Sequence, residues 1–243
     1  MGGQPMSRSK TMWVGAALLG LGLAAAPASA QYYGYRPAAE NALRIRLGLF
    51  TPEGGSAYWE EKTRDFTGDP DDFEDVSFGI EYQRELMPML HLLLGGTFFE
   101  GAHDQAYREF EDERGRPISH TASLETASFD AGLRLDLAPG GTPLVPYIGA
   151  GGKLVSWTLI EDGDFIDFST SPPEIFTDLF EAEGTATGYF LLLGVEVPVG
   201  RSFSFFAEGR WHEASDDLAD DFEDFGELDL SGRELAAGVS WRF

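Results

Sequence analysis

The chain has 243 residues, a formal net charge of −24 and no cysteine. An acidic balance of this size excludes nucleic acid as a partner, because neutralising phosphates requires a basic surface. The absence of cysteine excludes both disulfides and the lipid-bearing cysteine of a bacterial lipoprotein.

The first thirty residues have the three parts of an export signal. These are a basic start, an apolar run and a small-residue end: Arg8 and Lys10, Met12 to Ala26, and Ala28 to Ala30. The apolar run is shorter than the roughly twenty residues that a membrane-spanning helix needs. We therefore predict a signal peptide over residues 1–30, cleaved between Ala30 and Gln31, rather than a retained anchor. Residues 31–42 are expected to form a short periplasmic tail.

From residue 43 onward, the sequence contains eight segments in which apolar residues alternate with polar or small ones. The segments are residues 43–50, 76–84, 90–99, 126–137, 147–160, 185–197, 203–213 and 231–243. Most have 8 to 14 residues, and a tilted strand that crosses a membrane needs about 9 to 11. We predict a single all-β domain of eight antiparallel strands over residues 43–243.

The connections between these segments are long and short in strict alternation. The long ones are residues 51–75, 100–122, 161–183 and 214–229, and the short ones centre on residues 87–88, 139–141 and 198–200. In outer-membrane barrels the long loops face outside and the short turns face the periplasm. The alternation predicts an up-and-down transmembrane β-barrel with long acidic extracellular loops, short periplasmic turns and both chain ends on the short-turn side.

One face of most segments is apolar and is expected to contact lipid. These residues are Val76, Phe78, Ile80, Tyr82, Leu90, Leu92, Leu94, Phe98, Ala127, Phe129, Ala131, Leu133, Leu135, Leu137, Tyr189, Leu191, Leu193, Val195, Val197, Phe203, Phe205, Ala207, Trp211, Leu235, Ala237, Val239, Trp241 and Phe243. In the fifth segment neither face is clearly apolar. Because a lysine facing lipid costs about 2 to 4 kcal/mol at the bilayer centre, we expect Lys153 to point inward unless a bulge intervenes. Tyr147 and Trp157 would mark interfacial girdles only if they face outward.

The alternate positions carry most of the charge of the strands. They hold Arg44, Arg46, Glu81, Gln83, His91, Asp130, Arg134, Asp136, Glu196, Glu208, Arg210, His212, Glu234 and Arg242. Five arginines face six carboxylates in this set, and a buried charge persists only with a partner. Eight strands enclose a space that side chains can fill. We predict an interior closed by ion pairs, without a wide aqueous pore.

The long connections hold 31 of the 41 acidic residues and five basic ones. Carboxylate clusters of this kind bind Ca²⁺ or Mg²⁺ in other proteins. The candidates are Asp162, Asp164, Asp216, Asp217, Asp220, Asp221, Glu223 and Asp224. None matches the spacing of an EF-hand loop, so a solvated acidic rim is the preferred interpretation. The alternative is that divalent ions bridge these carboxylates to lipopolysaccharide phosphates.

No motif for catalysis or for a cofactor is found in the sequence. The segment Arg210 to Ser215 loosely resembles the His-x-Ser segment of lipid A deacylases, in which the two residues are two apart and share one strand face. Here His212 and Ser215 are three apart, so Ser215 is expected on the opposite face. His103 and His120 are expected in a loop, without metal-ligand spacing. We predict no catalytic, cofactor or metal residue and a protein that is not an enzyme.

The last segment, Leu235 to Phe243, alternates and ends on an aromatic residue, and it resembles the C-terminal assembly signal of outer-membrane barrels. Pro146-Tyr-Ile-Gly-Ala-Gly151 is similar to a fifth-strand opening of the same proteins. The mature chain therefore resembles the small outer-membrane β-barrel family. The resemblance implies the outer membrane of a Gram-negative bacterium, with outer-membrane lipids, lipopolysaccharide and the barrel-assembly machinery as partners.

The family resemblance does not specify an activity. We expect a non-enzymatic barrel that displays acidic loops, in a structural, adhesive or ion- and lipid-interacting role. One alternative is a narrow channel for small apolar solutes, lined by Leu93, Phe99, Phe190, Leu192 and Phe206. Others are a deacylase-like enzyme or a soluble lipocalin-like barrel with its apolar faces inside.

Overall fold

Eight long strands form the barrel of this protein, whose computed structural model describes residues 40–139 and 142–243. The predicted signal peptide and nearly all of the predicted tail lie outside the described residues. The strands are β1 (Asn41–Pro52), β2 (Asp75–Met87), β3 (Leu90–Glu111), β4 (Pro117–Asp136), β5 (Val145–Asp167), β6 (Glu174–Val199), β7 (Phe203–Asp217) and β9 (Gly232–Arg242). Among the described residues, no helix is both long and apolar enough to span a membrane.

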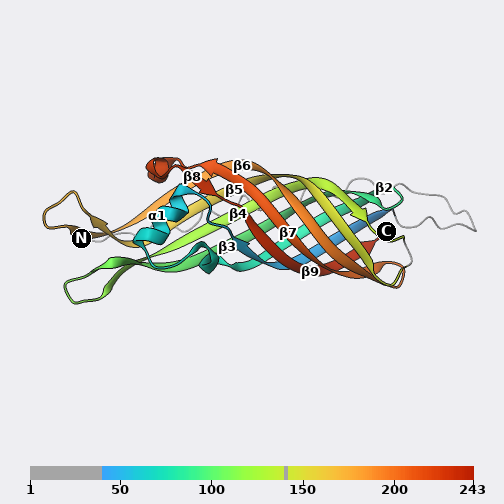
Figure 1. Cartoon of the computed structure of the whole chain (residues 1–243), viewed down its shortest axis with the longest axis horizontal. Helices are drawn as coiled ribbons and strands as arrows, with labels where there is room; N and C mark the ends of the chain where they lie inside the picture. The colour runs from blue at the N-terminus through green and yellow to red at the C-terminus, as the bar shows by residue number, and fades with distance from the viewer. Residues whose placement is uncertain (1–39, 140–141) are drawn as a thin grey trace, which may run out of the picture. The chain divides into compact units, whose positions relative to one another are not determined.

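Each barrel strand pairs antiparallel with its neighbour in the chain, and β1 closes the ring by pairing with β9 (Figure 1). In the register of the closing pair, Ile45 lies opposite Val239 and Ala42 lies opposite Arg242. The predicted eight-stranded antiparallel up-and-down β-barrel is confirmed. Four short elements lie at one end: the helix α1 (Ala57–Asp65), the 3-10 turns η2 (Pro70–Phe73) and η3 (Asp220–Phe225), and the strand β8 (Glu227–Asp229), which pairs with β7.

The four central strands are longer than the alternation predicted. The pairing of β3 with β4 continues through Gln105 and His120, and the pairing of β5 with β6 reaches Asp167 and Glu174. The connections predicted over residues 100–122 and 161–183 are therefore mostly strand. The two strands of a long hairpin satisfy each other's backbone hydrogen bonds. The hairpin can therefore continue beyond the apolar region, where its outer face no longer needs to be apolar. We call this the long-loop end of the barrel, and the end with the tight connections the short-turn end.

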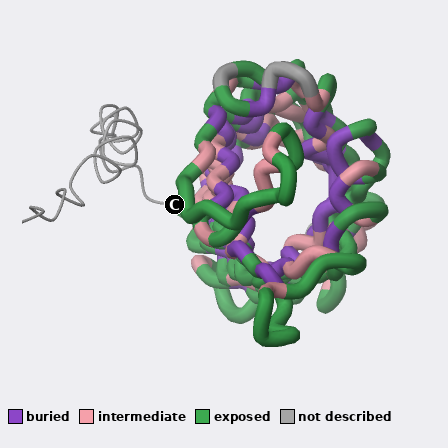
Figure 2. The backbone as a smooth tube through the Cα atoms, turned by 90° about the vertical axis from the view of Figure 1, so that its left-hand side faces the viewer, coloured by how far each residue is buried: buried purple, intermediate pink, exposed green. Residues whose placement is uncertain are grey.

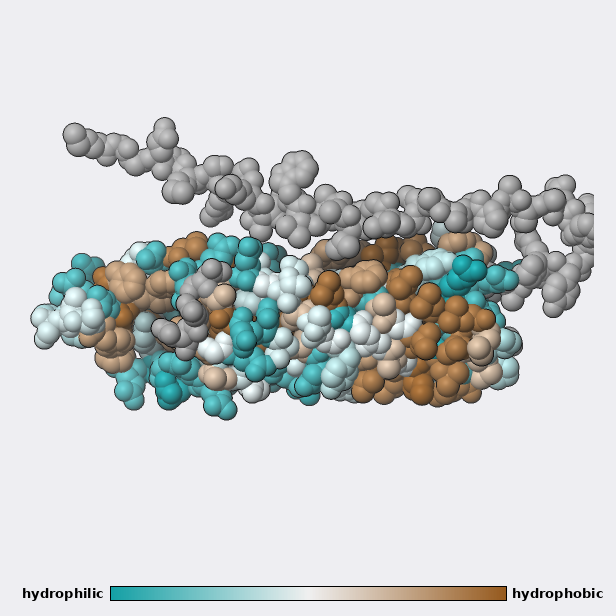
Figure 3. Space-filling view, turned by 90° about the horizontal axis from the view of Figure 1, so that it is seen from above, coloured by the Kyte–Doolittle hydropathy of each residue, from teal (hydrophilic) through white to brown (hydrophobic). Residues whose placement is uncertain are grey.

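Apolar side chains cover the outside of the barrel near the short-turn end (Figure 3). This apolar belt consists of the outward-facing residues of segments 43–49, 76–82, 90–98, 127–137, 148–154, 189–199, 203–211 and 235–243. Burial alternates along most of the strands, so neighbouring residues there point outward and inward (Figure 2). Leu191 is 51% exposed, whereas Leu192 is 3% exposed. The predicted orientation of the strands is confirmed, and it excludes the soluble barrel with its apolar faces inside.

The orientation of β5, which the sequence left open, follows the same alternation. Tyr147, Lys153 and Trp157 all point inward, while Ile148 and Leu154 point outward. Lys153 therefore avoids lipid without a bulge, and the two aromatic residues form no interfacial girdle.

Candidate functional site

Four charged residues at the centre of the lumen form a closed cycle of ion pairs. Arg44 contacts Glu81 at 2.6 Å and Glu208 at 2.9 Å, and Arg210 contacts the same two carboxylates at 2.7 Å each. Tyr147 adds a hydroxyl that donates to Glu208 at 2.8 Å. All of these side chains are buried. Each charge is paired more than once, as a buried charge must be to persist.

Further ion pairs continue the network on both sides of this cycle. Towards the long-loop end, Arg46 Nε lies 3.4 Å from Glu234 Oε1, and His212 Nε2 lies 3.5 Å from Glu234 Oε2. Towards the short-turn end, Arg134 contacts Glu196 at 2.7 Å. The polar residues predicted to face inward are buried or half-buried in the lumen, so that prediction is confirmed.

One cavity beside this network is small. A cavity of about 20 Å³ lies near Ser77, Lys153 and Glu234, and a single water molecule needs about 10 to 15 Å³. The residues proposed for an apolar route are buried, and Leu93, Phe190 and Leu192 pack together with Tyr147. A side chain at Gly151 would collide with the Phe190 ring. Leu93, Phe190 and Leu192 therefore form part of a buried layer inside the barrel.

The helix α1 closes the long-loop end, and the sequence did not predict it. Its buried residues Tyr58, Trp59 and Lys62 share one helical face. The Trp59 ring packs 5.2 Å from that of Phe73, and its Nε1 donates to the Asp229 carbonyl at 3.1 Å. Tyr58 and Trp59 join an apolar core with inward-facing residues of β4 to β7, and we call α1 with this core the plug. The local signal was weak: Ser56 is a preferred N-cap residue type, but the apolar residues after it, Ala57 to Trp59, are consecutive and the third buried position is Lys62.

A buried charged cluster connects the plug to the barrel wall. Glu161 of β5 accepts hydrogen bonds from Tyr58 Oη at 2.8 Å and from Lys62 Nζ at 2.6 Å. His120 Nε2 lies 3.6 Å from Glu161, and neither ring nitrogen of His120 has a hydrogen-bond partner. Burial lowers the pKa of His120 to about 4 and raises the pKa of Tyr58 well above its ordinary value. The cluster therefore holds a neutral imidazole beside an ion pair.

Both histidines that were predicted in a loop lie on strands instead. His103 is on β3 and His120 is on β4, because these strands extend beyond the predicted bounds. The prediction that His212 and Ser215 lie on opposite faces of one strand is confirmed. His212 is buried on β7, and Ser215 is exposed on the other face of that strand. The pair therefore lacks the shared face that a general base and its nucleophile need.

The predicted cation ligands lie on β5, β7 and η3 at the long-loop end. Asp162, Asp164 and Asp217 are exposed, and Asp216 accepts a hydrogen bond from Trp157 Nε1 at 2.9 Å. Asp221 accepts the Glu181 backbone N–H at 3.1 Å. The side chains of Asp220, Glu223 and Asp224 are not described. Within residues 40–139 and 142–243, no three acidic or histidine residues are grouped as metal ligands. Cation binding by these loops stays a prediction.

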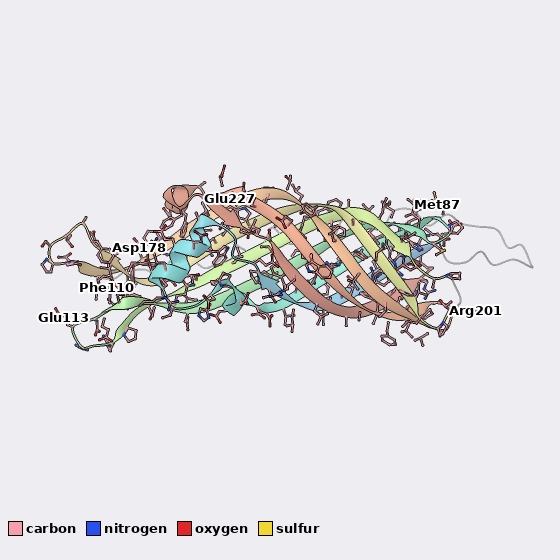
Figure 4. The ribbon with its side chains drawn as sticks, viewed as in Figure 1. Met87, Phe110, Glu113, Asp178, Arg201 and Glu227 are labelled. Carbon is pink, nitrogen blue, oxygen red and sulfur yellow. The ribbon has the colours of Figure 1, made fainter. Side chains whose placement is uncertain are left out.

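A pocket of about 710 Å³ lies beside α1 at the long-loop end. Eight aromatic residues line it: Phe66, Tyr107, Phe110, Phe165, Phe168, Phe180, Phe222 and Phe225. Figure 4 shows Phe110 near the end of the β3–β4 hairpin, with Met87 and Arg201 at the opposite end of the barrel. Sequence reasoning missed this pocket, because its residues come from five elements spread over more than 150 positions.

Solved structures of small outer-membrane proteins are similar to this chain in fold. Neisserial surface protein A aligns with a TM-score of 0.50 and 14% identity, over 84% of this chain and 97% of that one. The outer membrane protein OprG from Pseudomonas aeruginosa aligns with a TM-score of 0.50 and 11% identity, over 84% and 95% of the two chains. No protein-family model and no curated protein matches. The chain has the fold of small transmembrane β-barrels.

Proposed function

We propose that this protein is a non-enzymatic integral protein of the bacterial outer membrane that presents an acidic, aromatic-lined surface to the outside. The fold and the apolar belt support the location, since a belt of outward-facing leucines and aromatic residues is suited to hydrocarbon. In this orientation the long-loop end is extracellular and the short-turn end is periplasmic.

The observation that carries the proposal is the filled interior. The ion-pair cycle of Arg44, Glu81, Glu208 and Arg210 crosses the lumen, and the plug occupies the long-loop end. A solute would have to displace both. The exposed long-loop end, rather than the lumen, is then the part of the molecule that is available for recognition.

Single-channel recording in planar bilayers tests this proposal. The purified protein should insert without reproducible conductance steps, while a wide porin in the same bilayers gives them. Stable steps from the wild-type protein would overturn the closed interior and favour the channel alternative. Fractionation with outer membranes and heat-modifiable migration on gels test the location separately, and recovery as a dispersed protein without detergent would overturn it.

Export and assembly belong to the same proposal. A leader cleaved after Ala30 would deliver the chain to the periplasm, where the barrel-assembly machinery would read the last strand. The exposed rings of Trp241 and Phe243 lie 5.1 Å apart at that end of the chain. Deleting Phe243 should reduce the amount of folded barrel in the outer membrane, and unchanged assembly would argue against this role.

Lipopolysaccharide is the expected lipid partner, with Ca²⁺ or Mg²⁺ bridging its phosphates to exposed carboxylates such as Asp162 and Asp217. Adding Ca²⁺ to the detergent-solubilised protein should raise its thermal stability or slow proteolysis of the loops. If neither changes, this bridging does not occur. Incubation with lipopolysaccharide should release no acyl chains, and release that is lost in His212→Ala would instead establish a deacylase.

A further inference from the structure

The pocket beside α1 has the size of a small-molecule site. Its walls come from α1, β3, β5, β6 and η3, and it has a volume of about 710 Å³ and opens to solvent. Sites for small organic ligands usually measure about 300 to 1,000 Å³ and are lined mainly by apolar and aromatic side chains. The pocket lies outside the ion-pair network of the lumen, so a ligand could enter it without opening the barrel.

Aromatic rings form two continuous walls of this pocket. In one wall, the rings of Phe66 and Tyr107 lie 4.5 Å apart, those of Tyr107 and Phe110 lie 6.1 Å apart, and those of Phe110 and Phe168 lie 5.1 Å apart. Phenylalanines of β5, β6 and η3 form the other wall. Phe110 and Phe168 are 41% and 56% exposed, so part of each ring remains open to a ligand. Such surfaces favour a flat or apolar ligand body.

The charge around the pocket is negative. Five carboxylate side chains line it against two cations, Lys62 and Arg64, which leaves a net charge of −3. Both cations already form ion pairs with carboxylates of the pocket. Glu109 and Asp221 have no cationic partner within 4.0 Å in the described part of the chain. A cation would therefore be attracted to the pocket and an anion repelled.

Lys62 shows that the pocket walls accept an ammonium group. Its Nζ lies 4.6 Å from the centre of the Phe66 ring and 5.9 Å from that of Phe225. A cation within about 6 Å of an aromatic face is attracted by the ring quadrupole. The same walls continue outward to the rings of Phe110 and Phe168, over which no cation of the described residues lies.

From these observations we infer that the pocket binds a small organic cation, one that joins an ammonium or iminium charge to an aromatic or alkyl body. The rings would hold the body, and Glu109 and Asp221 would hold the charge. This inference goes beyond the proposed function and does not depend on where the barrel resides. Its failure therefore leaves the closed interior and the membrane location untouched.

Berberine, a flat aromatic cation whose fluorescence rises in an apolar site, is a suitable probe. The whole protein is placed in phosphatidylcholine nanodiscs, and the signal from empty nanodiscs is subtracted. We expect saturable binding of berberine and much weaker binding of the anion 8-anilinonaphthalene-1-sulfonate. Equal signals with protein-loaded and empty nanodiscs, or equal affinity for both dyes, would overturn the inference.

Paired variants identify the pocket as the binding site. The double variant Glu109→Gln/Asp221→Asn should weaken berberine binding about tenfold, because most of the net charge is removed. The matched control Glu113→Gln/Asp178→Asn removes two exposed carboxylates that do not line the pocket (Figure 4). It should leave the affinity unchanged. Equal loss in both pairs would mean unspecific attraction to an acidic surface and would overturn the inference.

The aromatic walls are tested in the same way. Phe110→Ser/Phe168→Ser should weaken binding about tenfold, whereas Phe176→Ser, an exposed position of β6 outside the lining, should not. Heat-modifiable migration confirms that each variant barrel is folded. Wild-type affinity in the Phe110/Phe168 variant would place the dye elsewhere and would contradict the assignment.

Discussion

The interior of this barrel is mainly ionic inside the apolar belt and mainly apolar in the plug above it, although the same strands build both parts. On β5, Lys153 points inward within the belt, while Val155, Trp157 and Leu159 point inward above it. On β7, the inward-facing residue is Arg210 within the belt and Ala214 above it. Within the belt, lipid receives the apolar side chains, so the charged ones turn inward and must pair. Above the belt, water surrounds the wall, and the strands revert to the ordinary arrangement with an apolar core.

The largest effect should come from breaking the ionic part. Arg210→Met removes the cation that contacts both Glu81 and Glu208 and leaves two buried carboxylates with fewer partners. Loss of one member of a buried ion pair costs about 3 to 5 kcal/mol. Urea unfolding of the detergent-solubilised protein should show this loss. Arg201→Met, an exposed arginine in the β6–β7 turn, is the control and should leave unfolding unchanged. A small loss in the Arg210 variant would mean that the cycle is dispensable.

In the plug the expected effect is smaller and local. Trp59→Phe removes the hydrogen bond to the Asp229 carbonyl and part of a buried side chain, a loss of about 1 to 2 kcal/mol. Helix α1 should then open about tenfold more often, and trypsin should cleave faster after Lys62 and Arg64. The midpoint of barrel unfolding should not move. The same change at Trp211, which is exposed in the belt, should not accelerate cleavage. Equal acceleration in the Trp211 variant would show that Trp59 does not specifically stabilise α1.

Acid should loosen the plug. Burial holds the pKa of His120 at about 4, against 6.5 for an unperturbed histidine. When α1 opens, the imidazole becomes accessible and binds a proton more readily, so closure loses stability as the pH falls from about 6.5 towards 4. Hydrogen exchange of residues 57–65, corrected for intrinsic rate, should be faster at pH 5 than at pH 7.

The variant His120→Gln isolates the contribution of this histidine, because Glu161 and Lys62 remain in place. The pH dependence of exchange should become shallower in this variant. His103→Gln, on the neighbouring strand β3, should retain the full dependence. An unchanged profile in the His120 variant would assign the acid sensitivity to another group.

The smallest effect should come from an ion pair of similar length whose arginine is exposed. Arg116 contacts Asp112 at 2.6 Å near the end of the β3–β4 hairpin, much as Arg210 contacts Glu208 at 2.7 Å in the lumen. Water screens the exposed pair and solvates either charge alone. Arg116→Met should leave urea unfolding unchanged. A loss comparable to that of the Arg210 variant would show that distance, not burial, sets the contribution.

The sequence was sufficient for the barrel but not for its long-loop end. The alternation of apolar and polar residues correctly predicted that Arg44, Glu81 and Arg210 point inward. This was possible because each strand must by itself present an apolar face to lipid. The ends of β3 to β6 were missed because, beyond the belt, acidic residues such as Asp162 and Glu183 stand at outward-facing positions of the strands. Without apolar residues at alternate positions, these segments have the sequence pattern of loops. The plug and the pocket depend on contacts between distant segments, such as Tyr58 with Glu161, which local patterns do not encode.

The change of environment along one strand can be measured directly, since the chain has no cysteine and single cysteines label uniquely. Spin labels at Leu191, Leu192 and Glu183 of β6 would sample the belt, the lumen and the wall above the belt. In liposomes, paramagnetic relaxation should show Leu191→Cys accessible to oxygen but not to a water-soluble nickel complex, and Glu183→Cys the reverse. Leu192→Cys should be shielded from both. Nickel access at position 191 equal to that at position 183 would contradict a lipid-facing belt, and with it the inward pairing of charge.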